Sequence, residues 1–154
     1  MLPPGIVQAT HEHVVELAET MGEADRAEVW AGAKQTPQEA LQRCMKHSLE
    51  AHSWLVDGRV ICMWGVGQYT PLSLVGVPWM LGSYELPKHA RTFARGSRAI
   101  AAEWQKRYPV LRNFVDARHT LAVRWVQWIG FTLLPAIPYG PDGLPFYPFE
   151  SERA

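Results

Sequence analysis

Residues 113–131 read NFVDARHTLAVRWVQWIGF. The stretch begins as an apolar strand end, turns at the polar residues Asp116 to His119, and continues as a short helix with a wide apolar face. Gly130 and Phe131 then end the helix, because glycine is often the residue just past a helix end. The stretch predicts a strand, a turn and a helix, followed by a return to the sheet.

The remaining sequence continues this alternation in both directions. The predicted order is β-α-α-β-β-β-α-β-α-β-β, which indicates an α/β or α+β fold in one domain, 1–154. We expect strands at 6–9, 51–56, 60–67, 73–81, 111–115, 131–137 and 144–149, and helices at about 11–31, from 37 onward, at about 87–107 and at 120–129.

Local signals place several element boundaries. Thr10 is expected to cap the first helix. Gly22 is a possible interruption of that helix, since glycine lowers helix stability by about 1 kcal/mol relative to alanine. Thr36, Pro37 and Glu39 form a capping box that begins the second helix. These signals predict two well-defined helix starts.

The strand signals are equally local. Asp57-Gly58 predicts a hairpin turn, and residues 60–67 are apolar almost throughout, as in a strand covered on both faces. Gly65 and Gly67 indicate a bulge or a close backbone approach. Pro78 lacks a backbone donor, so we expect a bulge or splay point there.

Charge is balanced overall but unevenly distributed. The net charge is zero, yet the first predicted helix is mainly acidic and the later half of the chain is mainly basic. This asymmetry predicts an anionic ligand on one side, or two solvated helix faces of opposite charge. Cys44 and Cys62 have no metal or redox spacing, and no signal peptide or membrane-length apolar run is visible, so we expect a cytoplasmic protein.

Other motifs indicate packing rather than chemistry. His11 and His13 would diverge on a helix, so no metal site is predicted. The mixture of arginine and tryptophan at 124–128 resembles a nucleic-acid stacking surface, but its helical spacing favours buried tryptophan packing. The proline-rich end at 144–149 is expected to pack on the sheet or to present an aromatic patch to a partner.

The stretch around residue 122 resembles the GNAT family of acyl-CoA N-acyltransferases, whose local pattern is N-x-x-A-x-x-x-Y-x-x-x-G-F. Ala122, Gly130 and Phe131 match, whereas His119 replaces the usual Asn and Val126 the frequent catalytic Tyr. The resemblance covers the order of the elements from 6 to 149. It implies a mixed, mostly antiparallel central sheet with helices on both faces, and two central strands that part near Leu81.

The resemblance also implies a binding site for acetyl-CoA or another acyl-CoA. In the family, the strand before the long helix lends its backbone to the pantetheine arm, and the pyrophosphate rests on the start of that helix. The residues that correspond here, or that supply positive charge nearby, are Leu81, Gly82, Ser83, Lys88, Arg91 and Arg95. The family's glycine-rich phosphate loop is missing, so the basic residues are expected either to replace it or to form a generic basic surface. Arg95 to Arg98 is a second possible register for that loop.

For proton transfer the resemblance indicates His119 and Asp116 as the first candidates. Val126 cannot donate a proton, and Tyr84, Glu85 and His89 are further possible replacements for the family's Tyr. The competing interpretation is structural: His119 caps the helix, or Asp116 and His119 stabilise the turn.

Residues 77–83, 95–98 and 115–118 resemble a narrower branch encoded by T7-like bacteriophages, which includes an internal virion protein. That resemblance implies a protein of the host cytoplasm or the virion. Two functions are therefore predicted. One is an acyl-CoA-dependent N-acyltransferase or CoA-binding protein with an unknown acceptor amine. The other is a catalytically degenerate module that binds a host or phage protein, and neither requires a membrane or nucleic acid.

Overall fold

The computed structural model describes residues 4–68 and 70–152, which form five helices and eight strands. The helices are α1 (His11–Thr20), α2 (Glu23–Ala33), α3 (Pro37–His47), α4 (Leu86–Arg107) and α5 (Thr120–Trp128). The strands are β1 (Ile6–Gln8), β2 (Ser48–Val56), β3 (Arg59–Gln68), β4 (Val75–Gly82), β5 (Val110–Asp116), β6 (Thr132–Leu133), β7 (Ile137–Tyr139) and β8 (Leu144–Glu152).

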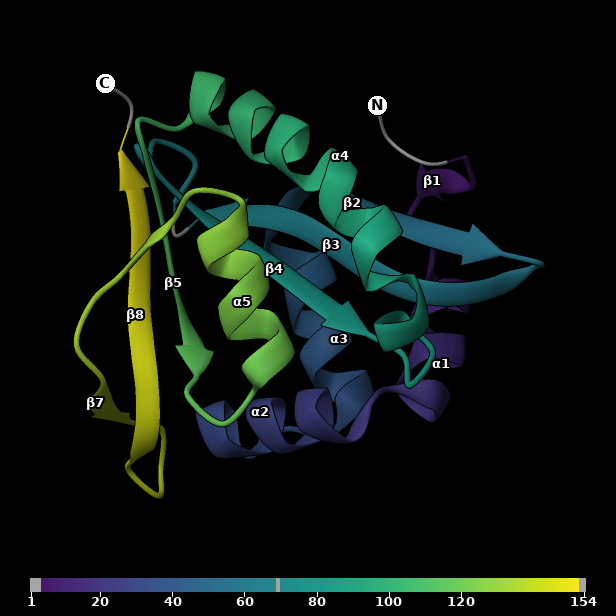
Figure 1. Ribbon diagram of the computed structural model, residues 1–154, viewed down its shortest axis with the longest axis horizontal. Coiled ribbons are helices and arrows are strands. Elements are labelled where there is room, and N and C mark those ends of the chain that lie inside the picture. Colours follow the sequence, from purple (N-terminus) through teal and green to yellow (C-terminus); the bar gives the residue numbers. More distant parts are fainter. Residues whose placement is uncertain (1–3, 69, 153–154) are drawn as a thin grey trace.

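The strands form one mixed sheet in the order β1-β2-β3-β4-β5-β8-β6, with β7 paired to β8. Only β4 and β5 run parallel among the described pairs; the others are antiparallel. Helices α1 to α3 pack on one face and α4 and α5 on the other (Figure 1). The predicted fold class is therefore confirmed. Within the described residues, no helix has the length and apolar character that crossing a membrane requires.

The helix expected at 11–31 is divided into α1 and α2. Met21 is extended and forms a bridge with Ser83, and the Gly22 amide donates to the carbonyl of Gly82 at 2.9 Å. The backbone between the two helices is thus hydrogen-bonded to the end of β4 and cannot remain helical. Thr10 and Thr36 both cap their helices as expected, each accepting from the backbone amide three residues later.

The prediction of a single strand at 131–137 is also wrong. The chain forms the short strands β6 and β7 instead, because Pro135 has no amide to donate and interrupts the ladder. Just before it, the Leu134 amide still donates to the carbonyl of Pro148 at 2.8 Å. Strand β7 forms a hairpin with the last strand, β8.

Two apolar clusters cover the faces of the sheet. The α4–α5 face contains Trp64, Phe93 and Trp104, and the α1–α3 face contains Leu17 and Leu41, all nearly inaccessible to solvent. Strand β3 is buried along almost its whole length, which confirms the prediction from its continuous apolar sequence. In the sheet, β3 pairs with β2 on one side and with β4 on the other.

Gly65 has the close contact that its position in β3 predicts. A Cβ atom there would lie 2.5 Å from the carbonyl oxygen of Glu50 and 3.0 Å from the ring of Trp79. We expect Gly65→Ala to lower the free energy of unfolding by about 3 kcal/mol, since overpacking forces backbone shifts. Gly32→Ala is the matched control: its nearest neighbour would be 3.9 Å away, and helix propensity favours alanine by about 1 kcal/mol. Urea denaturation of both variants measures the difference, and equal stabilities would contradict this account of Gly65.

Strands β4 and β5 separate soon after they begin. Only Val75 with Val110 and Gly76 with Leu111 are paired, and beyond these positions the strands diverge toward their carboxyl ends (Figure 1). The parting expected near Leu81 is therefore present, and it begins earlier along β4. It leaves an opening in the middle of the sheet.

Candidate active site

A cavity of about 450 Å³ occupies the opening between β4 and β5. On the α1–α3 face it is lined by α2 and α3, and on the other face by α5. The α5 residues that line it are Ala122, Trp125 and Val126. The Trp125 indole lines the cavity and donates a hydrogen bond of 2.8 Å to the Ser97 hydroxyl of α4.

The backbone of β4 presents free polar groups to this cavity. Antiparallel pairs alternate between hydrogen-bonded and non-bonded, and the Ser83 amide donates to Ile61 on β3. Counting back along the register, Met80 and Pro78 are non-bonded toward β3, so their backbone groups point toward β5. Pro78 has no donor, and its carbonyl accepts from the Asn113 side chain at 2.7 Å. The Met80 amide and carbonyl are left to face the opening.

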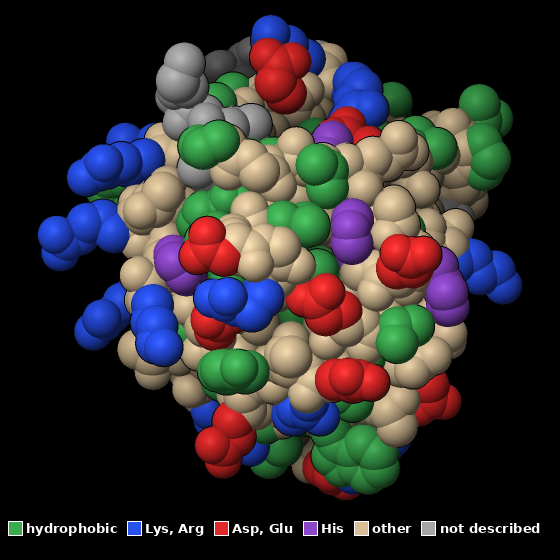
Figure 2. Space-filling view, turned by 90° about the vertical axis from the view of Figure 1, so that its right-hand side faces the viewer, with side chains coloured by type: hydrophobic (Ala, Val, Ile, Leu, Met, Phe, Trp, Pro, Cys, Tyr) green, Lys and Arg blue, Asp and Glu red, His purple; other side chains and the backbone are tan. Residues whose placement is uncertain are grey.

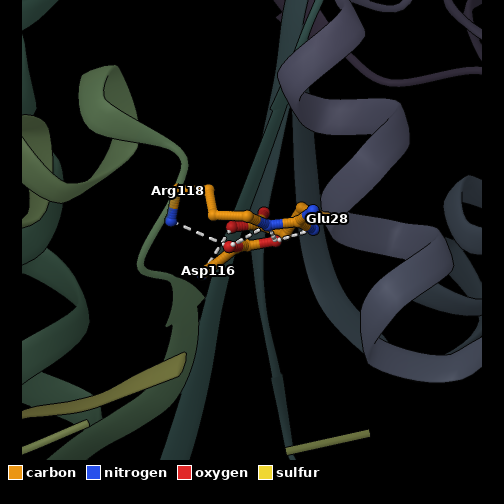
Figure 3. A network of polar contacts seen from close by, with 3 residues as sticks. All are labelled: Glu28, Asp116 and Arg118. Atoms are coloured by element: carbon orange, nitrogen blue, oxygen red, sulfur yellow. Dashed lines mark hydrogen bonds and ion pairs between the residues drawn. The ribbon is translucent and has the colours of Figure 1, made fainter. Parts of the chain in front are cut away.

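Glu28, on α2, is the carboxyl group of the cavity wall (Figure 3). It accepts a hydrogen bond of 2.9 Å from the backbone amide of Asp116, at the end of β5. Burial raises the pKa of Glu28 to about 7; the carboxylates of Asp25 and Asp116 act in the same direction, while His119 and the Asp116 amide oppose them. A carboxyl with this pKa can accept a proton at neutral pH.

Asp116 forms hydrogen bonds within the turn that precedes α5. Its buried carboxylate accepts from the Arg118 side chain at 2.7 Å and from the Arg118 backbone amide at 2.9 Å (Figure 3). Burial opposes ionisation, but these bonds hold the pKa of Asp116 below its ordinary value. Asp116 therefore stays ionised and orders the turn before α5, which is the structural alternative that the sequence left open.

His119 links α5 to α2. Its Nδ1 accepts from the Ala122 amide at 3.3 Å, so the proton is on Nε2, which donates to Asp25 at 3.1 Å. Burial alone would lower the pKa of His119, but the hydrogen bond to Asp25 and the nearby carboxylates of Glu28 and Asp116 raise it. Both ring nitrogens are thus in use, and His119 does not line the cavity.

The predicted coenzyme residues on β4 are held by neighbouring elements. The Leu81 side chain packs in the α1–α3 cluster and also lines the cavity. The Gly82 carbonyl accepts from Gly22, and the Ser83 hydroxyl and carbonyl accept from the amides of Glu85 and Leu86. With Pro87 next in sequence, the start of α4 has few amides to offer a phosphate.

The predicted basic residues lie on the outer side of α4. Lys88, Arg91 and Arg95 are exposed, and Lys and Arg side chains project from the α4 side of the molecule (Figure 2, left). Within the described chain, neither Arg91 nor Arg95 forms an ion pair. Arg98 differs, because it donates to the Trp128 carbonyl and stacks 4.0 Å over that ring. Lys88, Arg91 and Arg95 remain predicted phosphate contacts.

Glu28 is the site residue that sequence reasoning missed. In the sequence, Glu28 is one of several acidic residues of the first predicted helix, and no motif separates it from the others. Asp25 belongs to the same acidic segment, yet it is only 8% exposed. The signal available was the break at Gly22, which turns α2 toward the end of β5.

No family model matches the sequence, and no curated protein matches it. Solved structures do match in fold. Ribosomal-protein-alanine N-acetyltransferase from Brucella melitensis superimposes with a TM-score of 0.71 at 11% identity, over 96% of this chain and 99% of its own. Ard1 from Thermoplasma volcanium gives 0.72 at 14% identity, over 97% of both chains. AAC(6')-Ib in complex with ribostamycin and coenzyme A gives 0.65 at 15% identity, over 96% of this chain and 92% of its own.

The chain therefore has the fold of the GNAT N-acetyltransferases. The similarity extends over nearly the whole chain, although sequence identity is low in every one of these superpositions. Fold alone does not determine activity, so function has to be argued from the cavity and its residues.

Proposed function

We propose that the protein transfers an acyl group from an acyl-CoA to an amine, with the coenzyme's arm in the opening between β4 and β5. The observation that carries the proposal is this opening, whose cavity joins an apolar side at α5 to a proton-accepting carboxyl, Glu28, at α2. Neighbouring strands of a sheet are ordinarily joined by backbone hydrogen bonds. Here the divergence of the strands and the proline at 78 both keep the centre of the sheet open.

The residues of the cavity suit acyl transfer. An acyl-CoA supplies the acyl group as a thioester. The Met80 amide faces the opening and can donate to the acyl carbonyl oxygen, which polarises it. Glu28 accepts a proton from the amine, whose nitrogen then bonds to the acyl carbon as the carbon–sulfur bond breaks. In sum, an ammonium and a thioester become an amide, a thiol and one released proton.

The fit to the coenzyme differs between its two ends. The cavity and the Met80 backbone suit the extended arm, whereas the start of α4 lacks the free amides that would wrap a pyrophosphate. Lys88, Arg91 and Arg95 are the groups available for the phosphates. We therefore expect binding that depends strongly on salt.

Thermal denaturation with coenzyme A tests the proposal. A hundredfold excess over Kd should stabilise the fold by about 2.7 kcal/mol, which raises Tm by several degrees. The double variant Arg91→Glu/Arg95→Glu should lose this shift, while Lys46→Glu, an exposed charge reversal on α3, should keep it. If millimolar coenzyme A leaves the Tm of the wild-type protein unchanged, the proposal fails.

A second candidate is a binding module that retains the fold without catalysis. Two observations favour this candidate. The amides at the start of α4 are already hydrogen-bonded, and Val126 lines the cavity at the position where the family pattern has Tyr. Its partner would be a host or phage protein, in line with the sequence resemblance at 77–83. Retention of a protein from bacterial lysate by the wild-type chain, together with no response to coenzyme A, is the result this function predicts.

A further inference from the structure

The part of the cavity lined by α2 and α3, where the proposed mechanism places the acceptor amine, has charges of opposite sign on its two helical walls. Glu28 lines it from α2 and Arg43 lines it from α3. The two helices are joined by the short turn at 34–36. Glu28 and Arg43 therefore lie on two walls of the same cavity.

The two charges differ in how far they are already satisfied. Asp25 and Asp116, which lie beside Glu28, are already paired with His119 and Arg118, so Glu28 is the carboxyl at that end of the cavity that an ammonium group can bind. Arg43 is exposed at the opposite wall, and among the described residues no carboxylate lies within ion-pair distance of it. His47, one helical turn further on, lines the same wall. This wall therefore suits an anion.

The surface between the two charges is mostly apolar. The aliphatic and aromatic residues that line the cavity here are Val29, Ala33, Ala40, Trp79, Phe114 and Tyr139. The Phe114 and Tyr139 rings stack with their centroids 4.3 Å apart, which gives this wall a fixed shape. An apolar body fits here better than a sugar, because few polar groups are offered to its hydroxyls.

We propose that the acceptor is a small ω-amino acid, a molecule with its amine at one end and its carboxylate at the other, which places the amine at Glu28, an apolar body along this wall and the carboxylate at Arg43. The inference rests on the proposed function and specifies its substrate class. An arginine guanidinium binds a carboxylate through two parallel hydrogen bonds, which fixes the orientation of the molecule. The amine is thereby directed toward Glu28 and the opening.

The test compares two amines that differ only at the carboxylate. With acetyl-CoA as donor, 4-(aminomethyl)benzoate should be acetylated with a kcat/KM at least about tenfold above that of 4-(aminomethyl)benzamide. Arg43→Met should raise KM for the benzoate about tenfold and leave the benzamide nearly unaffected. Lys46→Met, an exposed substitution on the same helix, is the control and should change neither.

The outcomes separate this inference from the proposed function. Equal rates on the two amines, or an Arg43→Met variant that retains the preference, overturn the acceptor class and leave acyl transfer standing. Coenzyme A binding without acetylation of 4-(aminomethyl)benzoate also overturns it. Absence of both binding and transfer is instead a failure of the proposed function.

Discussion

Glu28→Gln should reduce kcat by about two to three orders of magnitude, because glutamine cannot accept the amine proton. In the wild-type protein, kcat/KM should rise with pH as Glu28 ionises near its pKa of about 7. The Glu28→Gln variant should lack this rise of kcat/KM with pH. Steady-state rates of thiol release from acetyl-CoA, measured between pH 5.5 and 9, provide the comparison.

The same substitution should make the protein more stable at alkaline pH. The pKa of Glu28 is about 7 in the folded chain against 4.5 as its ordinary value, so the folded state holds this proton more tightly. The stabilisation of the folded state by this bound proton is fully present below pH 4.5 and is lost as pH rises through 7. Glutamine avoids the loss, and we expect a gain of about 1–3 kcal/mol at pH 8 and almost none at pH 4.5.

The control for this position is Glu19→Gln, which neutralises an exposed carboxylate on α1. It should leave both the rate and the unfolding free energy nearly unchanged, since exposed charges contribute little. The groups facing Glu28 are Asp25 on α2, Asp116 and Arg118 at the end of β5, and His119 before α5. A Glu28→Gln variant that keeps more than half of the wild-type rate would remove Glu28 from the mechanism.

Ala122→Phe should abolish the response to coenzyme A. Ala122 is on α5 and lines the cavity on the side opposite α2, so a phenyl ring there fills the path of the coenzyme's arm. The Tm shift of several degrees expected for the wild-type protein should disappear in differential scanning calorimetry. Activity should fall in parallel.

Ala136→Phe is the matched control, because residue 136 is exposed between β6 and β7 and does not line the cavity. It should respond to coenzyme A as the wild-type protein does. The ligand-free Tm of both variants shows whether each remains folded. A folded Ala122→Phe variant with an undiminished shift would place the coenzyme elsewhere.

The sequence predicts most of the fold because its signals are local. The capping box at Thr36, the turn at Asp57-Gly58 and the apolar run of β3 act through near neighbours, and all three are confirmed. One error arises where a distant segment decides, because the break between α1 and α2 depends on a hydrogen bond to Gly82. The other has a local cause, since Pro135 lacks the amide that would continue the ladder with β8.

The site was less predictable for the same reason. The resemblance at Ala122 and Val126 located one wall of the cavity, and both residues line it. Glu28 becomes distinctive only when α2 packs against the end of β5, about which the acidic composition of the segment says nothing. His119 and Asp116 lie next to Glu28 in space, but of the three only Glu28 lines the cavity.

The most direct test of the central claim is an NMR titration of the ¹⁵N-labelled wild-type protein with coenzyme A. If the arm of the coenzyme lies between β4 and β5, the Met80 amide and the Trp125 indole resonances should move together and saturate with the same Kd. Unchanged Met80 and Trp125 resonances at millimolar coenzyme A, with or without shifts on the outer side of α4, would contradict it.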